Sequence, residues 1–107
     1  MADMADISDK MAELQKMRVA LILTTSAETS KLLSRRQRVS GKEIEVMCAE
    51  RDIAEGAATA RDQERLEVLW AEDAKLKEAL AESEQDIAKL EELIAQVNAD
   101  IAALCQA

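Results

Sequence analysis

Apolar residues recur at steps of three and four along most of the chain, which is the spacing of one face of an α-helix. The clearest example is the segment 87–104, IAKLEELIAQVNADIAAL, where an apolar pair returns every seven residues. A second series with the same spacing runs through residues 4–21. The pattern therefore predicts helices at both ends of the chain, each with an apolar stripe.

The strongest helix boundary in the sequence lies in the stretch RVSGKEIEV. Ser40 and Glu43 have the spacing of a capping box, in which each side chain accepts a hydrogen bond from the other residue's amide. Gly41 stands between them, and glycine is a common chain breaker. These residues predict a turn near residues 38–42.

The composition favours an all-α fold. Proline is absent, there are two glycines, and the good helix formers Ala, Leu, Glu, Lys and Gln are abundant. We expect an elongated antiparallel helical hairpin over residues 1–75, followed by a coiled-coil segment over residues 76–107. The alternative is a closed three-helix bundle in which the chain folds back near Ser83. A further interruption of the pattern lies at Gly56, where small residues and a polar run follow.

The C-terminal segment carries a heptad pattern, with apolar residues at positions a and d and Ser83 as the one polar d residue. Ile at a with Leu at d favours parallel two-stranded coiled coils. A hairpin that turns near residue 40 would leave this stripe uncovered, so we expect it to form a partner or oligomer interface. The interface residues are Leu76, Leu80, Ile87, Leu90, Ile94, Val97, Ile101 and Leu104.

Charge is divided unevenly along the chain. Residues 1–40 hold seven basic and five acidic side chains, residues 41–107 hold seven and seventeen, and the net charge is −8. Sequence-independent binding to nucleic acid depends on Lys and Arg releasing counterions from phosphates, which an acidic chain does not favour. We expect the partner to be the chain itself, as a homodimer, or another helical protein, and not a nucleic acid.

One cluster of basic residues lies close to the predicted turn. It could contact an acidic protein surface or phosphates, but the chain has one Trp and neither Phe nor Tyr to stack on bases. The simplest interpretation is a solvated cluster that complements the dipole at a helix C-terminus. The candidate contact residues are Lys31, Arg35, Arg36, Arg38 and Lys42.

The side-chain inventory offers little for catalysis or cofactor binding. There is no His, no Tyr and no glycine-rich loop, so an ordinary base near neutral pH and a phosphate cradle are both missing. We expect no enzyme activity, no cofactor, no metal and no small-molecule substrate. Cys48 and Cys105 cannot form a disulfide framework, which points to a reducing cytoplasm. The apolar run 19–23 is too short to span a membrane and is interpreted as a buried helix face.

These observations favour a non-enzymatic assembly, adaptor or chaperone-like protein that acts through coiled-coil contacts. The alternative is an acidic inhibitor or nucleic-acid mimic that occupies a basic surface of its target. Basic residues interleave with the acidic ones along the chain, which favours the first hypothesis.

Overall fold

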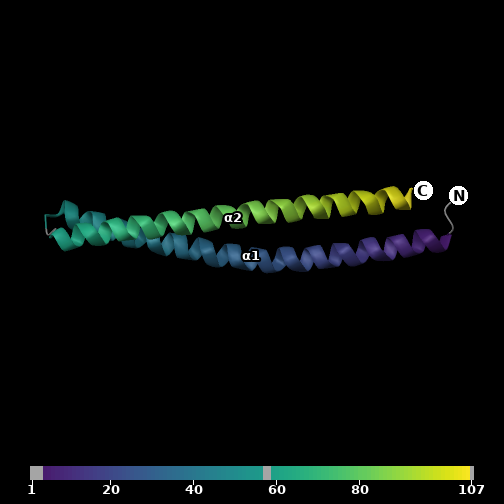
Figure 1. Cartoon of the computed structure of the whole chain (residues 1–107), viewed down its shortest axis with the longest axis horizontal. Helices are drawn as coiled ribbons and strands as arrows, with labels where there is room; N and C mark the ends of the chain where they lie inside the picture. The colour runs from purple at the N-terminus through teal and green to yellow at the C-terminus, as the bar shows by residue number, and fades with distance from the viewer. Residues whose placement is uncertain (1–3, 57–58, 107) are drawn as a thin grey trace. The chain divides into compact units, whose positions relative to one another are not determined.

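The computed structural model describes residues 4–56 and 59–106, and nearly all of them are helical (Figure 1). Helix α1 spans Met4–Ala54 and helix α2 spans Ala60–Cys105. No strand occurs among the described residues. The prediction of an all-α helical hairpin is therefore confirmed. The three-helix alternative is wrong, because α2 continues through Ser83 without a break.

The first side of the hairpin turn is a glycine cap at the end of α1. The Gly56 amide donates a hydrogen bond to the Ile53 carbonyl at 3.1 Å, and the Glu55 amide donates to the Arg51 carbonyl at 2.9 Å. Gly56 has a φ of 84°. Only glycine adopts this left-handed conformation at little cost, which is why it commonly ends helices.

The second side of the turn is a capping box formed by Thr59 and Asp62. The Asp62 amide donates to Thr59 Oγ1 at 3.3 Å, and the Thr59 amide donates to the Asp62 carboxylate at 2.9 Å. These bonds satisfy amides that the first turn of a helix leaves without intrahelical partners. The bond from the Thr59 amide, followed by that from its hydroxyl, lowers the pKa of Asp62 below its ordinary value.

The turn predicted near residues 38–42 is wrong, because these residues lie inside α1. Val39 and Val46 are 8% and 9% exposed on the same helix. Burying two such side chains contributes about 1.5–3 kcal/mol each, whereas a glycine such as Gly41 inside a helix costs roughly 1 kcal/mol. Packing therefore outweighs the local signal, and the chain reverses between the end of α1 and the start of α2.

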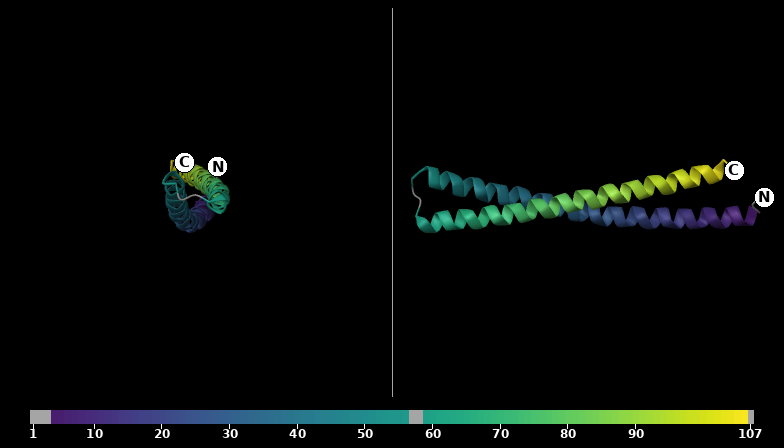
Figure 2. Two further views of the ribbon diagram at one scale, coloured as in Figure 1. Left: turned by 90° about the vertical axis from the view of Figure 1, so that its left-hand side faces the viewer. Right: turned by 45° about the horizontal axis from the view of Figure 1, so that its top comes forward.

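Contacts between the helices divide the chain into two units. Unit 1 comprises Met1–Ser30 and Gln85–Ala107, and unit 2 comprises Lys31–Glu84. The parts of α1 and α2 nearest the turn run side by side in unit 2 (Figure 2). Neither unit ends at the division expected after residue 75, where α2 is unbroken.

Unit 2 has the more deeply buried core. Val46, Leu66 and Leu69 form a cluster in which each side chain is at most 9% exposed, and Ile53 packs against it. Among the described residues of unit 1, Val97 is the one apolar side chain buried to this degree, at 5% exposure. The other apolar residues between the helices of unit 1 are only half-buried.

The residues of each helix that face the other helix follow a seven-residue repeat, which is the pattern of a coiled coil. We call these buried and half-buried positions the seam. On α1 they are Ile7, Met11, Leu14, Leu21, Thr25, Glu28, Leu32, Arg35, Val39, Lys42, Val46, Ala49 and Ile53. On α2 they are Asp62, Leu66, Leu69, Asp73, Leu76, Leu80, Ser83, Ile87, Leu90, Ile94, Val97, Ile101 and Leu104.

Candidate interaction surfaces

The C-terminal stripe predicted to form a partner interface belongs to the seam within the chain. Leu76 and Leu80 lie in unit 2, and the stripe residues from Ile87 to Leu104 lie in unit 1. Val97 is buried and the others are half-buried. The expectation that the stripe stays uncovered is therefore wrong, because α1 continues to Ala54 and its N-terminal part lies alongside the stripe from Ile87 to Leu104. The stripe is assigned to a partner interface because it is expected to be uncovered, and that reason no longer holds.

A polar layer interrupts the apolar seam of unit 2. Arg35 of α1 donates hydrogen bonds to the Ser83 hydroxyl and, at 2.9 Å, to the Ala79 carbonyl of α2. Ser83 is fully buried. A single polar residue in a coiled-coil seam fixes register and orientation at some expense in stability. Arg35 and Ser83 therefore specify how α1 and α2 align in unit 2.

Two lysines form ion pairs on either side of this seam. Lys42 lies 2.6 Å from the Glu72 carboxylate and 3.3 Å from that of Glu45, and the hydrogen bond to Glu72 is the main cause of its raised pKa. Lys77 lies 2.9 Å from Asp73, whose hydrogen bond is the main cause of the raised pKa of Lys77. The pairs of Lys42 with Glu45 and of Lys77 with Asp73 lie within one helix, whereas Lys42 with Glu72 and Lys77 with Glu43, at 3.4 Å, join α1 to α2. Exposed pairs contribute little stability, so the two that join the helices act mainly on their alignment.

The basic cluster predicted from the sequence is divided by the fold. Arg35 and Lys42 are seam residues with partners inside the chain, whereas Lys31, Arg36 and Arg38 are exposed. The structure gives Arg36 and Arg38 no ion pair with any described residue. The interpretation as a cluster at a helix C-terminus is wrong, because α1 continues well beyond it.

The side of α1 that faces away from α2 in unit 2 carries no charged residue from Leu33 to Cys48, although 34% of the chain is charged. The exposed Arg51 is the first charged residue beyond Cys48 on this side. Leu33, Ile44 and Met47 on this side are 53%, 62% and 67% exposed. We call it the uncharged face. Its residues are Leu33, Ser34, Gln37, Ser40, Gly41, Ile44, Met47 and Cys48, all of them exposed.

The equivalent positions of α1 over residues 19–30 of unit 1 are uncharged as well. Val19 and Leu23 are 57% and 65% exposed, so the interpretation of the run 19–23 as a buried helix face is wrong for these residues. Thr24 and Ser30 direct their hydroxyls to the carbonyls four residues before them, so the hydroxyl donors are satisfied within the helix. The uncharged residues are Val19, Ala20, Leu23, Ser26, Ala27 and Ser30.

Gly41 has no structural explanation within the chain. A Cβ atom added at this position would have no atom within 4 Å, and its φ is not positive. A glycine in a helix interior costs roughly 1 kcal/mol relative to alanine and usually has a packing or functional reason. Glycine also allows close approach of another backbone. The lack of a side chain at Gly41 leaves the centre of the uncharged face open to such an approach.

Charged residues flank the uncharged face in two blocks of opposite sign along α1. All of them are exposed. The block nearer the N-terminus is basic, and the block nearer the turn is acidic apart from the exposed Arg51 beside it. The basic block is Lys31, Arg36 and Arg38, and the acidic block is Glu43, Glu45, Glu50 and Asp52.

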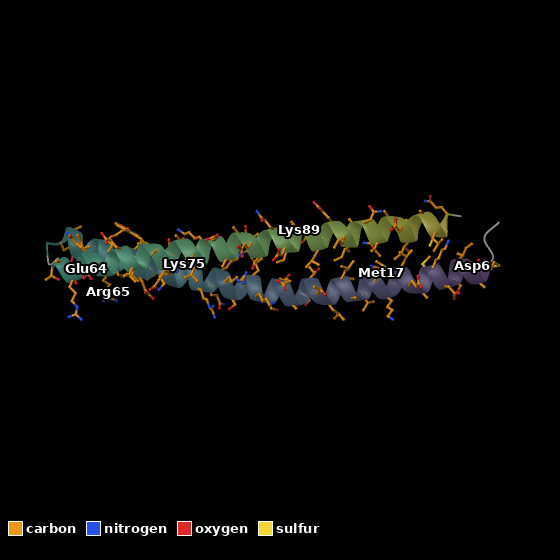
Figure 3. The ribbon with its side chains drawn as sticks, viewed as in Figure 1. Asp6, Met17, Glu64, Arg65, Lys75 and Lys89 are labelled. Carbon is orange, nitrogen blue, oxygen red and sulfur yellow. The ribbon has the colours of Figure 1, made fainter. Side chains whose placement is uncertain are left out.

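A groove of about 450 Å³ lies between the two helices of unit 1. Leu14, Met17 and Leu104 supply much of its apolar lining, and Met17, labelled on α1 in Figure 3, is 53% exposed. Charged side chains stand at the groove as well. The full lining is Lys10, Glu13, Leu14, Met17, Asp100, Ala103 and Leu104.

Two of these features have signals in the sequence. Thr59 and Asp62 have the spacing of a capping box, three residues after Gly56, and together they locate the turn. The uncharged face follows from placing α1 on a helical wheel once its seam is known. The contact between Arg35 and Ser83 has no local signal, because it depends on the alignment of two distant segments.

Two kinds of site are absent from the part of the chain that the structure describes. Within residues 4–56 and 59–106 no group of three or more Cys, Asp or Glu side chains is placed to hold a metal ion. In the same part of the chain, neither helix contains a stretch that is both long enough and apolar enough to cross a membrane. Comparisons with protein families, curated proteins and solved structures find no match to this chain.

Proposed function

We propose that this chain is a non-enzymatic adaptor or assembly protein that binds an amphipathic helix of another protein in the groove of unit 1. The observation that carries the proposal is the half-buried apolar lining of this groove, with Met17 more than half exposed. Binding an amphipathic helix through apolar anchors spaced along one face is a common mode of recognition. A third helix at this position would bury the seam residues that two helices leave partly exposed.

Charge indicates which helices would fit. Unit 1 contains nine acidic and four basic residues, so it favours a partner helix with basic edges. Cys48 and Cys105 are free, exposed thiols, and a reducing compartment such as the cytoplasm suits them. Chaperone-like activity would use the same groove for helical segments of different proteins.

The test compares two variants of unit 1 that make the same kind of change on opposite edges of α1. Met17→Gln removes an apolar side chain from the groove, and Ile22→Gln does so outside it, at a residue that is 44% exposed. We expect binding of a synthetic amphipathic peptide with lysine edges to weaken roughly tenfold in Met17→Gln, since about 1.5–3 kcal/mol accompanies burial of such a side chain. Ile22→Gln should bind like the unchanged chain.

The peptide experiment also distinguishes the alternative function. An acidic inhibitor or nucleic-acid mimic would bind basic peptides through charge alone, with strong dependence on salt and no dependence on Met17. If the unchanged chain, Met17→Gln and Ile22→Gln bind the peptide equally and salt abolishes the binding, the groove is not the binding site and mimicry is favoured. The same three proteins, used to capture partners from the native host, would then identify the target.

A further inference from the structure

We propose that a second copy of this chain packs against the uncharged face of unit 2. In this arrangement α1 of one copy lies antiparallel to α1 of the other, and the two-fold axis passes near Gly41. This surface is separate from the groove that the proposed function uses, so either proposal can fail without the other.

Charge complementarity identifies both the occupant and its direction. With two α1 helices antiparallel about Gly41, Arg38 lies opposite Glu45 of the second copy, and Arg36 lies near its Glu43. Basic and acidic blocks therefore meet on both edges of the contact. In a parallel arrangement each arginine would face the same arginine of the other copy, and like charges so placed repel. The chain is thus complementary to itself in one direction only.

The same alignment matches the uncharged face with itself, as a two-fold interface requires. Leu33 of one copy lies opposite Met47 of the other, and Ser34 lies opposite Cys48. Gly41 meets Gly41 at the centre, where the absence of a side chain allows the two backbones to approach closely. This gives Gly41 the packing role that it lacks within one chain.

The size of the contact predicts a weak, reversible dimer. Residues 31–52 of a helix extend about 33 Å, and a helix is about 10 Å wide, so the footprint is roughly 330 Å² per copy. Stable complexes bury about 1,200–2,000 Å² in total, and smaller contacts are typically transient. The dimer should therefore form only at high protein concentration, and covalent trapping is the appropriate measurement.

The test uses the predicted neighbours Ser34 and Cys48 of different copies. In a Cys105→Ser background, we would add Ser34→Cys and oxidise the protein mildly at high concentration. A bond between positions 34 and 48 of one chain is impossible, because they lie about 21 Å apart along a helix and a disulfide needs Cα atoms within about 7 Å. A disulfide-linked dimer with bonds between positions 34 and 48, mapped by mass spectrometry, is the expected product.

The controls decide whether the contact is specific. Ala81→Cys in the same background adds an exposed thiol on α2 of unit 2, and its crosslinking measures random collision. We expect Ser34→Cys to crosslink at least roughly tenfold faster, because a specific complex raises the effective concentration of the two thiols. Equal rates would overturn the proposal. A product joined mainly between two Cys48 residues would also overturn it, because that bond requires parallel helices.

A second variant tests the axis without threatening the fold. Gly41→Glu places two carboxylates together at the centre of the dimer, while Glu is a better helix former than Gly. We expect this change to slow the Ser34 to Cys48 crosslink to the collision rate with full helicity retained. Ala81→Glu, which adds the same charge on α2, should leave the crosslink unchanged. Unchanged crosslinking in Gly41→Glu would reject the two-fold axis at this residue.

Discussion

Arg35 of α1 donates hydrogen bonds both to the buried hydroxyl of Ser83 and to the carbonyl of Ala79, and so places a polar link between the two helices inside the seam of unit 2. Above and below this layer the seam is largely apolar, with Leu32 and Val39 each 8% exposed. An apolar seam with a seven-residue repeat could pair in several registers that differ by one heptad. The polar layer distinguishes one of them, because a shift of one heptad would separate Arg35 from Ser83 and place its guanidinium against Leu76 or Leu90.

Replacing both members of this pair should raise stability and lower specificity. Buried polar pairs exchanged for well-packed apolar residues often give variants that are more stable by about 1–4 kcal/mol. We expect Arg35→Leu with Ser83→Leu to shift the urea midpoint upward. Crosslinks between engineered cysteines should then show more than one alignment. Ser83→Leu alone should be destabilising, because it leaves the Arg35 cation against an apolar surface; a stabilising single change would contradict this role for the pair.

The two glycines of the chain should respond to alanine with opposite signs. Gly56 has a φ of 84°, so Gly56→Ala should cost about 1–2 kcal/mol for a left-handed conformation. Gly41 lies inside α1 with open space around it, so Gly41→Ala should stabilise the monomer by about 1 kcal/mol. Urea denaturation at low protein concentration measures both. A destabilising Gly41→Ala would show that this glycine has a role within the single chain.

Stability in acid should depend on the capping box at the start of α2. Hydrogen bonds from Thr59 hold the pKa of Asp62 below its ordinary value of 3.8. The ionised carboxylate therefore stabilises the folded chain above pH 3.8, and this contribution is lost as the pH falls through the lower pKa of the folded state. Thermal denaturation should show Asp62→Ala less stable than the unchanged chain at pH 7 and nearly equal to it in strong acid.

Glu64→Ala is the matched control for this effect. Glu64 lies in the same turn of α2 (Figure 3) and makes no hydrogen bond or ion pair with a described residue. Its removal should leave the pH dependence unchanged. Thr59→Ala should cost about 1 kcal/mol, as expected for loss of an N-cap. If Asp62→Ala and Glu64→Ala lose stability equally at pH 7, the effect comes from general charge at the helix N-terminus and not from the capping box.

The fold class was predictable from the sequence, whereas the choice between two possible turns, at Ser40 and at Gly56, was not. Apolar periodicity and the absence of proline determine two helices, since these properties act along many residues at once. The position of the turn depends on two competing effects. The capping signal at residues 40–43 favours a helix boundary there. Burial of Val39 and Val46 in a continuous helix contributes more stability than that boundary would. That comparison requires knowing what α1 packs against, which only the alignment with α2 reveals.

The predicted position of the turn decides which residues are expected to form an interaction site. With a turn near residue 40, the stripe from Ile87 to Leu104 has no cover and becomes an interface. With the turn after Gly56, α1 covers the stripe, and the exposed surfaces are the groove at Met17 and the face around Gly41. Both surfaces consist of residues that the contact between α1 and α2 leaves exposed. They can therefore be predicted from the sequence only after the seam residues of each helix have been assigned.

The two units should lose structure separately when one seam is broken. Ile94 and Ile101 are half-buried seam residues of unit 1, and replacing both with Asp places carboxylates without partners against an apolar surface, which is strongly unfavourable. About half of the helical residues belong to unit 1. We expect Ile94→Asp with Ile101→Asp to remove a large part of the helical circular dichroism signal while unit 2 keeps its fold.

Trp70 makes this prediction measurable, because it is the one aromatic residue of the chain and lies in unit 2. Its indole nitrogen donates to Glu50 of α1 at 3.1 Å, so its fluorescence reports whether α1 and α2 are paired there. In the double variant the urea transition of Trp70 fluorescence should be unchanged. Leu66→Asp with Leu69→Asp, in the core of unit 2, should abolish that transition. If the unit 1 variant also abolishes it, the seam unfolds as one cooperative structure and the two units are not independent.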